Sequence, residues 1–489
     1  MTARAPREDA AAALAAIPRS RILRNTGAQM GGRVAIALLR LVVAAIVVRL
    51  FGAGTFGEYA LVFALLAFAE WIVDFGTTEM FVREASREPA RERELLRVVT
   101  ALKCVQAPVA LVALAVAVLV LGYPSQVVEA TLVGGAGLVF YAGILVFRVA
   151  FKAHLTLERE VAAEAVSVIA MIAMVLATAR MGGGLAALVG CHVVSRAIFL
   201  ALCMLFGRRD FTLSVKGVTR ADMKWGAGIS STVGVIGLLV ALYEMVDLLV
   251  LSKLASTAEL GYYSGAQRLL WPLLLALASI GGTLYPIAAR YWPADRARFA
   301  TACQRGLDAV VVLAGLPLAS MLAAPEFYLG LLGPDLVAGA PALRLLSLLV
   351  FIKAISSTVG PVLFVVHAQR QTLFFIAVAV AMKALVVAVL VARFGYLGAA
   401  VGALLVEAAF GAGPTLYLLR RHGELRLRWG VTLKVALAIG VAAAAAAALL
   451  PGSSLAAAAL APAVFVAGAA ALGALRMADI RLLLRRGES

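Results

Sequence analysis

The sequence predicts an all-α membrane protein with about 14 transmembrane helices, arranged as two six-helix lobes plus a C-terminal helix pair. Of its 489 residues, 63% are hydrophobic and only 15% are charged, whereas soluble domains are about 45–50% apolar. Fourteen apolar runs are long enough to cross a bilayer, and one stretch returns 204 residues later. Together these observations exclude a soluble globular fold.

The spans follow from the length of the apolar runs. A helix needs about 20 apolar residues to cross about 30 Å of hydrocarbon, and backbone polar groups in lipid must be satisfied within the helix. By this measure the predicted spans are 28–51, 58–82, 98–121, 130–151, 161–179, 185–206, 226–251, 261–288, 303–324, 341–366, 371–392, 396–419, 431–450 and 454–474.

The repeat indicates two equivalent halves. RLFGAGTFGEY at 49–59 returns as KLASTAELGYY at 253–263, and residues 179–182 similarly echo 392–395. In the first pair a basic residue ends an apolar run and a short connector precedes the next, which predicts a helix, a tight crossing and a helix. Two halves of equal orientation are typical of transporters whose substrate site lies between them. Gly57 and Gly261 are the predicted hinge and crossing positions.

The loops predict the orientation. Basic residues gather in alternate loops, which places both termini in the cytoplasm and explains the net charge of +17 without a nucleic-acid partner. The predicted parts are a cytoplasmic N-terminal tail (1–27), an N-lobe with spans 1–6 (28–206), a cytoplasmic linker (207–225), a C-lobe with spans 7–12 (226–420), an additional helix pair (431–474) and a cytoplasmic, amphipathic tail (475–489).

Several chemistries are not expected. The cysteines Cys104, Cys191, Cys203 and Cys303 lie in apolar runs without ligand spacing, so they are interpreted as core residues rather than disulfides or metal ligands. The sequence contains no G-x-x-x-x-G-K-[ST] loop and no nucleophile–base arrangement in its short loops. We therefore expect neither an enzyme nor a nucleotide-driven pump, and no cofactor beyond a coupling H⁺ or Na⁺.

Charged residues inside the predicted spans are the candidate site. They are costly in a bilayer, so each indicates a function by default. Arg33 and Arg40 lie close to one helical stripe in span one, and acidic residues share helix faces in spans two (Glu70, Asp74) and seven (Glu244, Asp247). Further candidates are Lys103, Arg148, Glu164, Arg196, Arg268, Arg305, Asp308, Arg344, Lys353, Lys383 and Glu407.

These charges have structural explanations as well. Arg268 and Arg305 lie near span ends and could extend to the headgroups. The arginines of span one and the acids of span two could instead form static ion pairs between helices, with no ligand. His192 is interpreted as a packed polar residue rather than a proton relay.

Several stretches resemble a known superfamily. They are FGAGTFGEYA at 51–60, DFG at 74–76 with the TTEMFVRE that follows, Asp247 with LGYY at 260–263, and LGLLGPDLVAGAPALRLL from Leu329. On these residues the chain resembles the multidrug/oligosaccharidyl-lipid/polysaccharide exporters over about residues 20–420. Within them it is similar to the polysaccharide flippases of the Wzx type, and its fourteen spans also fit the related lipid II flippases.

The resemblance implies a substrate and a route. The expected cargo is an oligosaccharide on undecaprenyl pyrophosphate, moved by alternating access from the inner to the outer leaflet of a bacterial cytoplasmic (inner) membrane. The product would be O-antigen, capsule or exopolysaccharide. Expected partners are this lipid-linked glycan, membrane lipids and, in addition, a polysaccharide polymerase and glycosyltransferases.

The resemblance also implies roles for the charges. Arg33, Arg40, Arg148 and Arg268 are expected to bind substrate, because a guanidinium matches phosphate oxygens. Glu70, Asp74, Glu244 and Asp247 are expected to pair with these arginines or to carry a coupling proton or Na⁺. Two rival classes remain open. In a cation-coupled multidrug antiporter the acids would bind cationic drugs, and in a membrane scaffold the pairs would be fixed.

Overall fold

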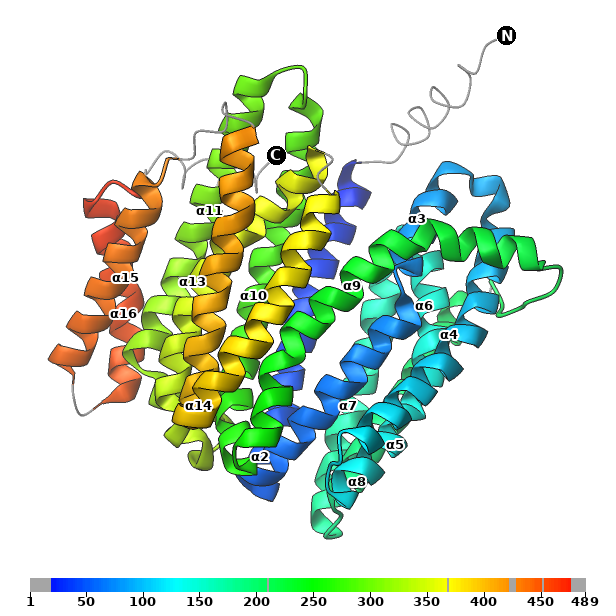
Figure 1. The fold of residues 1–489 in the computed structure, drawn as a ribbon, viewed down its shortest axis with the longest axis horizontal. Coiled ribbons are helices and arrows are strands. Elements are labelled where there is room, and N and C mark those ends of the chain that lie inside the picture. The colour runs from blue at the N-terminus through cyan, green and yellow to red at the C-terminus, as the bar shows by residue number, and fades with distance from the viewer. Residues whose placement is uncertain (1–18, 209–210, 367–368, 422–427, 451–452, 476–489) are drawn as a thin grey trace. The chain divides into compact units, whose positions relative to one another are not determined.

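The regular structure of the described chain is helical. The computed structural model describes residues 19–208, 211–366, 369–421, 428–450 and 453–475 (Figure 1). Packing divides the chain into two compact units. Unit 1 comprises Met1–Ile46 and Glu58–Met245, and unit 2 comprises Val47–Gly57 and Val246–Ser489. The long helices α2 (Arg19–Asp74) and α9 (Arg220–Leu254) therefore each contribute residues to both units.

The other helices each belong to one unit. Unit 1 contains α3 (Thr77–Arg87), η1 (Pro89–Arg91), α4 (Glu92–Val120), α5 (Ser125–Gly135), α6 (Gly137–Ala153), α7 (Leu157–Arg180) and α8 (Leu185–Gly207). Unit 2 contains α10 (Thr257–Tyr291), α11 (Arg296–Ala323), α12 (Pro325–Leu332), η2 (Pro334–Gly339), α13 (Ala340–Val365), α14 (Gln369–Arg421), α15 (Gly430–Leu449) and α16 (Ser454–Ala471).

The helices confirm the predicted all-α membrane fold. Within the described residues, 11 helical segments are long and apolar enough to cross a membrane. Two of them, Gly31–Arg87 and Gln371–Leu418, contain 57 and 48 residues. At 1.5 Å per residue each exceeds about 70 Å, enough for two crossings of a 30 Å hydrocarbon layer. Helix α10 coincides with a further predicted span. These segments account for the fourteen predicted spans.

Glycines divide the two longest helices. Gly52 in α2 has φ 81 and Gly395 in α14 has φ 55, a left-handed conformation that favours a residue without Cβ. Gly182, between α7 and α8, has φ 69 and is the counterpart of Gly395 in the second sequence echo. The echo thus corresponds to a glycine with positive φ at the equivalent helix junction of each unit.

One break was not predicted. The second span was expected to run unbroken over 58–82, but α2 ends at Asp74 and α3 begins at Thr77. Phe75 (φ 42) and Gly76 (φ 71) lie between them, both with positive φ. The sequence carries a signal of the break, because Gly76 and the polar residues 77–79 follow Asp74, but the predicted span continues through them.

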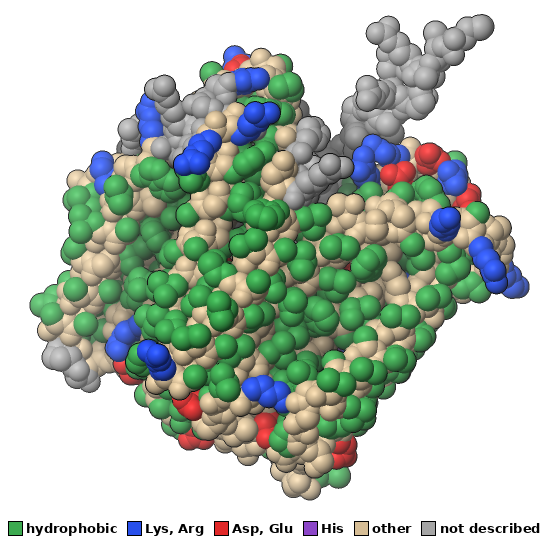
Figure 2. Space-filling view, in the orientation of Figure 1, with side chains coloured by type: hydrophobic (Ala, Val, Ile, Leu, Met, Phe, Trp, Pro, Cys, Tyr) green, Lys and Arg blue, Asp and Glu red, His purple; other side chains and the backbone are tan. Residues whose placement is uncertain are grey.

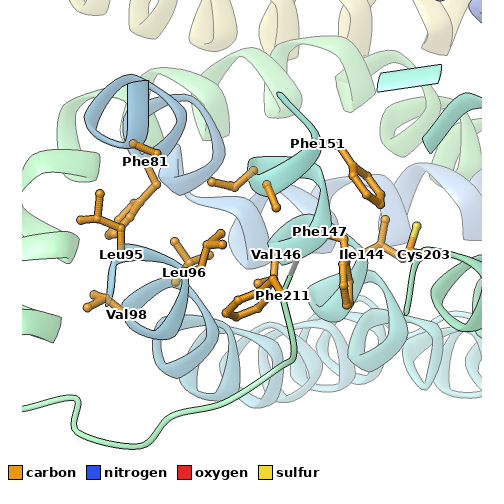
Figure 3. Close-up of a cluster of buried hydrophobic side chains, with 14 of the residues drawn as sticks. Phe81, Leu95, Leu96, Val98, Ile144, Val146, Phe147, Phe151, Cys203 and Phe211 are labelled. Carbon is orange, nitrogen blue, oxygen red and sulfur yellow. The ribbon is translucent and has the colours of Figure 1, made fainter. Parts of the chain in front are cut away.

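The core of unit 1 lies between α3, α4, α6 and α8. Figure 3 shows Phe81 of α3 and Leu96 of α4 within the same buried cluster as Phe147 of α6. The Phe147 ring lies 6.3 Å from that of Phe211, which follows α8. Buried aromatic rings in such contacts fix the spacing of these helices.

The last two helices pack against α11 within unit 2 (Figure 1). A Cβ atom on Gly315 of α11 would lie 2.2 Å from the Phe465 ring of α16, so the glycine makes room for this ring. Ser320 Oγ of α11 donates a hydrogen bond of 2.6 Å to the Ala458 carbonyl oxygen. Small residues permit this close helix packing where the hydrophobic effect is weak.

The surface agrees with a membrane location. Figure 2 shows hydrophobic side chains along the middle of the helices, with Lys, Arg, Asp and Glu mainly near helix ends. The predicted tails fall largely on residues 1–18 and 476–489, which lie outside the described residues. The predicted lobe boundaries and the orientation of the chain stay predictions.

Candidate functional site

Arginine–glutamate pairs link the helices of unit 1. Arg40 of α2 donates through Nη2 to Glu164 Oε1 of α7 at 2.6 Å. One turn earlier on α7, Glu160 Oε1 accepts a hydrogen bond of 2.5 Å from Arg148 Nε of α6. Because Glu160 and Glu164 are four residues apart, both carboxylates lie on one face of α7.

A third pair joins this group through an aromatic ring. Arg196 of α8 donates through Nη2 to Glu70 Oε1 of α2 at 2.5 Å. Its guanidinium carbon lies 4.7 Å from the centroid of the Tyr141 ring, and that of Arg148 lies 6.0 Å from the same centroid. Both cations thus contact one ring within the range of a cation–π interaction. We call Arg40, Arg148, Arg196, Glu70, Glu160 and Glu164 the arginine–glutamate network.

The network carries three positive and three negative side chains, so its formal charge is balanced. The side chains of its arginines range from 12% exposed at Arg196 to 49% exposed at Arg40, so part of each guanidinium-bearing side chain remains accessible. Guanidinium forks are suited to bidentate binding of carboxylate or phosphate. An anionic ligand could replace a glutamate on such a fork without any change in the donor geometry.

A second polar cluster surrounds Lys103 of α4 in unit 1. Its ammonium donates to the carbonyl oxygens of Val73 and Asp74, at 2.7 and 3.0 Å, and to Thr77 Oγ1. The Asp74 carboxylate lies 3.7 Å from this ammonium and accepts from the backbone N–H and hydroxyl of Thr78. Asp74 therefore holds the first turn of α3 in the manner of a helix cap.

Unit 2 contains a buried lysine–aspartate pair. Asp247 Oδ2 of α9 lies 2.9 Å from Lys383 Nζ of α14 and accepts from the Tyr263 hydroxyl of α10 at 2.8 Å. The other carboxylate oxygen, Oδ1, has no hydrogen-bond partner among the described residues. With 2% of Asp247 exposed, this charge depends on its two partners.

The two predicted crossings contact each other within unit 2. A Cβ atom on Gly57 would lie 2.3 Å from the Thr257 carbonyl oxygen, and one on Gly261 would lie 2.1 Å from that of Ala53. Arg49 reaches from the first crossing to the carbonyl oxygens at the end of α12, with Nη2 3.1 Å from Leu331 O. A cation at a helix C-terminus is favourable, so this contact ties the first crossing to unit 2.

The structure brings some predicted site residues together and separates others. Arg40, Arg148 and Glu70 belong to the network, whereas Arg33 is exposed on α2 and is not part of it. Glu244 is exposed on the part of α9 that belongs to unit 1. Arg268, half-buried on α10, and Asp247 belong to unit 2.

Three residues that contact the predicted charged residues were not predicted as part of the site. Glu160 falls one residue before the predicted fifth span, yet it precedes Glu164 by one helical turn, a spacing that could have identified it. Tyr141 carries no sequence signal, because aromatic residues are common in spans. Tyr263 lies in the repeat and in the LGYY stretch, but was not assigned a role at the site. Arg196, Glu164, Lys103 and Lys383 were candidates without an assigned role.

Comparison with known proteins defines the family. The profile described as "Polysaccharide biosynthesis protein" matches residues 22–292. The chain belongs to this family. No curated protein matches it.

Solved structures share its fold. A multidrug resistance MATE family transporter of the MOP superfamily, in an inward-facing conformation, is 14% identical with a TM-score of 0.65, covering 80% of this chain and 95% of that one. The lipid II flippase MurJ, in an inward closed conformation, is 11% identical with a TM-score of 0.71, covering 94% and 99%. A MOP superfamily transporter from Pyrococcus furiosus is 14% identical with a TM-score of 0.57, covering 84% and 97%.

Proposed function

We propose that this protein flips an undecaprenyl-pyrophosphate-linked oligosaccharide from the inner to the outer leaflet of a bacterial cytoplasmic membrane, for export of O-antigen, capsule or exopolysaccharide. The observation that carries the proposal is the arginine–glutamate network inside a chain of the polysaccharide biosynthesis family. Both termini are proposed to lie in the cytoplasm, and a polymerase and glycosyltransferases are the proposed protein partners.

The chemistry of the cargo fits the network. A pyrophosphate brings about two negative charges, and leaving them unpaired away from water would cost several kcal/mol. The network holds three guanidinium groups, each already on a carboxylate. We propose that the diphosphate replaces these carboxylates, so that the empty protein keeps its arginines paired and the loaded protein keeps its cargo paired.

This exchange gives the acids a role in coupling. A carboxylate that loses its arginine in a poorly hydrated site is stabilised by a proton or a Na⁺ ion. Among the residues predicted to couple transport to an ion, Glu70 is paired with a network arginine, Arg196. We therefore propose Glu70 as the acid that takes up H⁺ or Na⁺ when diphosphate binds.

The paired crossings support the proposed alternating access. Gly57 and Gly261 permit backbone contact at the two repeated helix junctions, where any side chain would force the helices apart. We propose that these contacts form and separate during the transport cycle.

The test removes network arginines one at a time. Arg40→Ala, Arg148→Ala and Arg196→Ala should lower surface polysaccharide at least about tenfold at equal protein abundance, because a charge-assisted hydrogen bond contributes about 1.5–3 kcal/mol. Arg→Lys at the same positions should restore export only partly, since an ammonium lacks the planar fork.

The control is Arg87→Ala, whose arginine pairs with Glu84 on the surface of α3. It should leave export unchanged. Normal surface polysaccharide in an Arg40→Ala/Arg148→Ala double variant would contradict the proposal. If Glu70→Gln instead made cells sensitive to cationic drugs, a cation-coupled multidrug antiporter would be favoured. Proteoliposomes that flip lipid II but no polysaccharide repeat-unit lipid would indicate a lipid II flippase.

A further inference from the structure

Five oxygen atoms surround the ammonium of Lys103. They are the Val73 carbonyl at 2.7 Å, the Asp74 carbonyl at 3.0 Å, Gln106 Oε1 at 3.1 Å, Asp74 Oδ1 at 3.7 Å, and Thr77 Oγ1. An ammonium has three donors. The site therefore offers more oxygens than Lys103 can satisfy by hydrogen bonding, and we call these five oxygens the Lys103 cage.

The cage exists because the helix is broken. Phe75 and Gly76 leave the helical conformation, so the Val73 and Asp74 carbonyls lose the N–H partners that a continuous helix would supply. The Thr78 N–H, which would otherwise bond to the Asp74 carbonyl, donates instead to Asp74 Oδ1 at 3.2 Å. In membrane transporters, unwound carbonyls at the end of a half-helix are groups that coordinate a monovalent cation.

The composition of the cage suits one monovalent charge. Its ligands are two carbonyls, a hydroxyl, an amide oxygen and a single carboxylate, all hard oxygen donors with a total charge of −1. Lys103 is 3% exposed, so the positive charge is held away from water. A single positive charge neutralises this site, whereas a divalent ion would leave an excess.

The packing around the break requires that it stay in place. A Cβ atom on Gly76 would lie 2.7 Å from the Gly234 nitrogen of α9, and one on Gly234 would lie 2.7 Å from the Phe75 carbonyl oxygen. The corner between α2 and α3 thus fits into a recess of α9 within unit 1. If the Val73 and Asp74 carbonyls lost their cation, the corner would be less stable and so would its backbone contact with Gly234.

We propose that the Lys103 ammonium is a tethered cation that fills a monovalent-cation site at the α2–α3 break. An alkali ion, Na⁺ or K⁺, binds in the cage when the ammonium is removed. Because the cation is covalently attached, the native break keeps its geometry at any concentration of dissolved salt. The inference rests on unit 1 alone and does not depend on the identity of the cargo.

The experiment measures thermal unfolding of the full-length protein in detergent. The solutions contain NaCl, KCl or N-methyl-D-glucamine chloride at equal ionic strength. Wild-type protein should have the same Tm in all three. Lys103→Ala should have a lower Tm in N-methyl-D-glucamine chloride, and its Tm should rise by several degrees, saturably, with Na⁺ or K⁺. Lys103→Met, which keeps the apolar stem, should behave in the same way.

Two controls separate ion binding from a general salt effect. Lys103→Ala/Asp74→Asn should lose the saturable rise, because the cage has lost its only carboxylate. Lys152→Ala removes a lysine that pairs with the largely exposed Glu79, and its Tm should not depend on the alkali ion.

Three outcomes would overturn the proposal. One is a Tm of the Lys103 variants that is indifferent to Na⁺ and K⁺, and another is a rise that persists without the Asp74 carboxylate. The third is failure of both Lys103 variants to accumulate in cells, since abundant cytoplasmic K⁺ should have filled the cage.

Discussion

Two lysine–aspartate pairs with buried lysines, one in each unit, use the same two residue types in different ways. Lys103 lies at a broken helix and is surrounded by backbone carbonyls as well as Asp74. Lys383 belongs to α14 and meets Asp247 of α9, with the Tyr263 hydroxyl as a second donor to the same carboxylate oxygen. The first ammonium has more acceptors than it can satisfy, and in the second pair one carboxylate oxygen has no donor among the residues that the structure describes.

The difference follows from the backbone. A continuous helix uses its carbonyls internally, so Asp247 can neutralise Lys383 only with its side chain. A break releases carbonyls, and these stabilise Lys103 together with the carboxylate. The comparison shows that a charged residue in a span acquires its role from the backbone beside it, which a list of charged residues does not reveal.

The largest expected effect is at Lys383. Lys383→Ala leaves the buried Asp247 carboxylate without its cation and should destabilise the protein by about 3–5 kcal/mol. Thermal unfolding in detergent measures this change. Na⁺ or K⁺ should not restore stability, because Lys383 lies within a continuous stretch of α14, whose carbonyls are used inside the helix and are not released to bind an ion. If Na⁺ or K⁺ restored the stability of Lys383→Ala, the Lys383 and Lys103 sites would not differ in their ability to bind an alkali ion.

The double variant sharpens this test. Lys383→Met/Asp247→Leu removes both charges and should recover most of the lost stability, since replacing a buried ion pair with apolar residues is often neutral. A double variant as unstable as Lys383→Ala would show that the cavity, rather than the unpaired charge, causes the loss.

An intermediate effect is expected at Asp74. Asp74→Ala removes the acceptor of the Thr78 N–H in the first turn of α3 together with the carboxylate of the Lys103 cage, and should cost about 2 kcal/mol. Asp74→Asn keeps an acceptor for the Thr78 N–H and should lose less, which the difference in Tm between the two variants measures. Equal losses would mean that the hydrogen bond from the Thr78 N–H contributes nothing to stability and that only the negative charge of Asp74 matters.

The smallest effect is expected at an exposed pair in unit 1. Arg91 binds Glu88 and Glu94 on the surface of the α3–α4 connection, at 3.0 and 2.9 Å. Exposed ion pairs of this kind contribute little, because water and salt screen them. Arg91→Ala should leave the Tm unchanged within error. A change in Tm as large as that of Asp74→Ala would show that exposed ion pairs contribute to stability as much as the pair at the α2–α3 break.

Much of the fold could be predicted from local sequence. The apolar runs locate the helices, because a span must satisfy its own backbone wherever it lies in the chain. The repeat predicted the crossings at Gly57 and Gly261, and the structure places them in backbone contact. The α2–α3 break was missed, because Gly76 and the polar residues that follow it were included in one span, although a glycine beside polar residues indicates a helix break.

The sequence by itself determined the class of the protein, the positions of its spans and the charged residues that lie in them. Hydrophobicity is a local property, and the bilayer imposes one length on every span. Only the tertiary structure decided which charges pair. Arg40 and Glu164 are 124 residues apart in the chain, and Arg196 and Glu70 are 126 apart. Such partners are selected by how the helices pack, because a buried charge is stable only beside the opposite charge that packing brings to it.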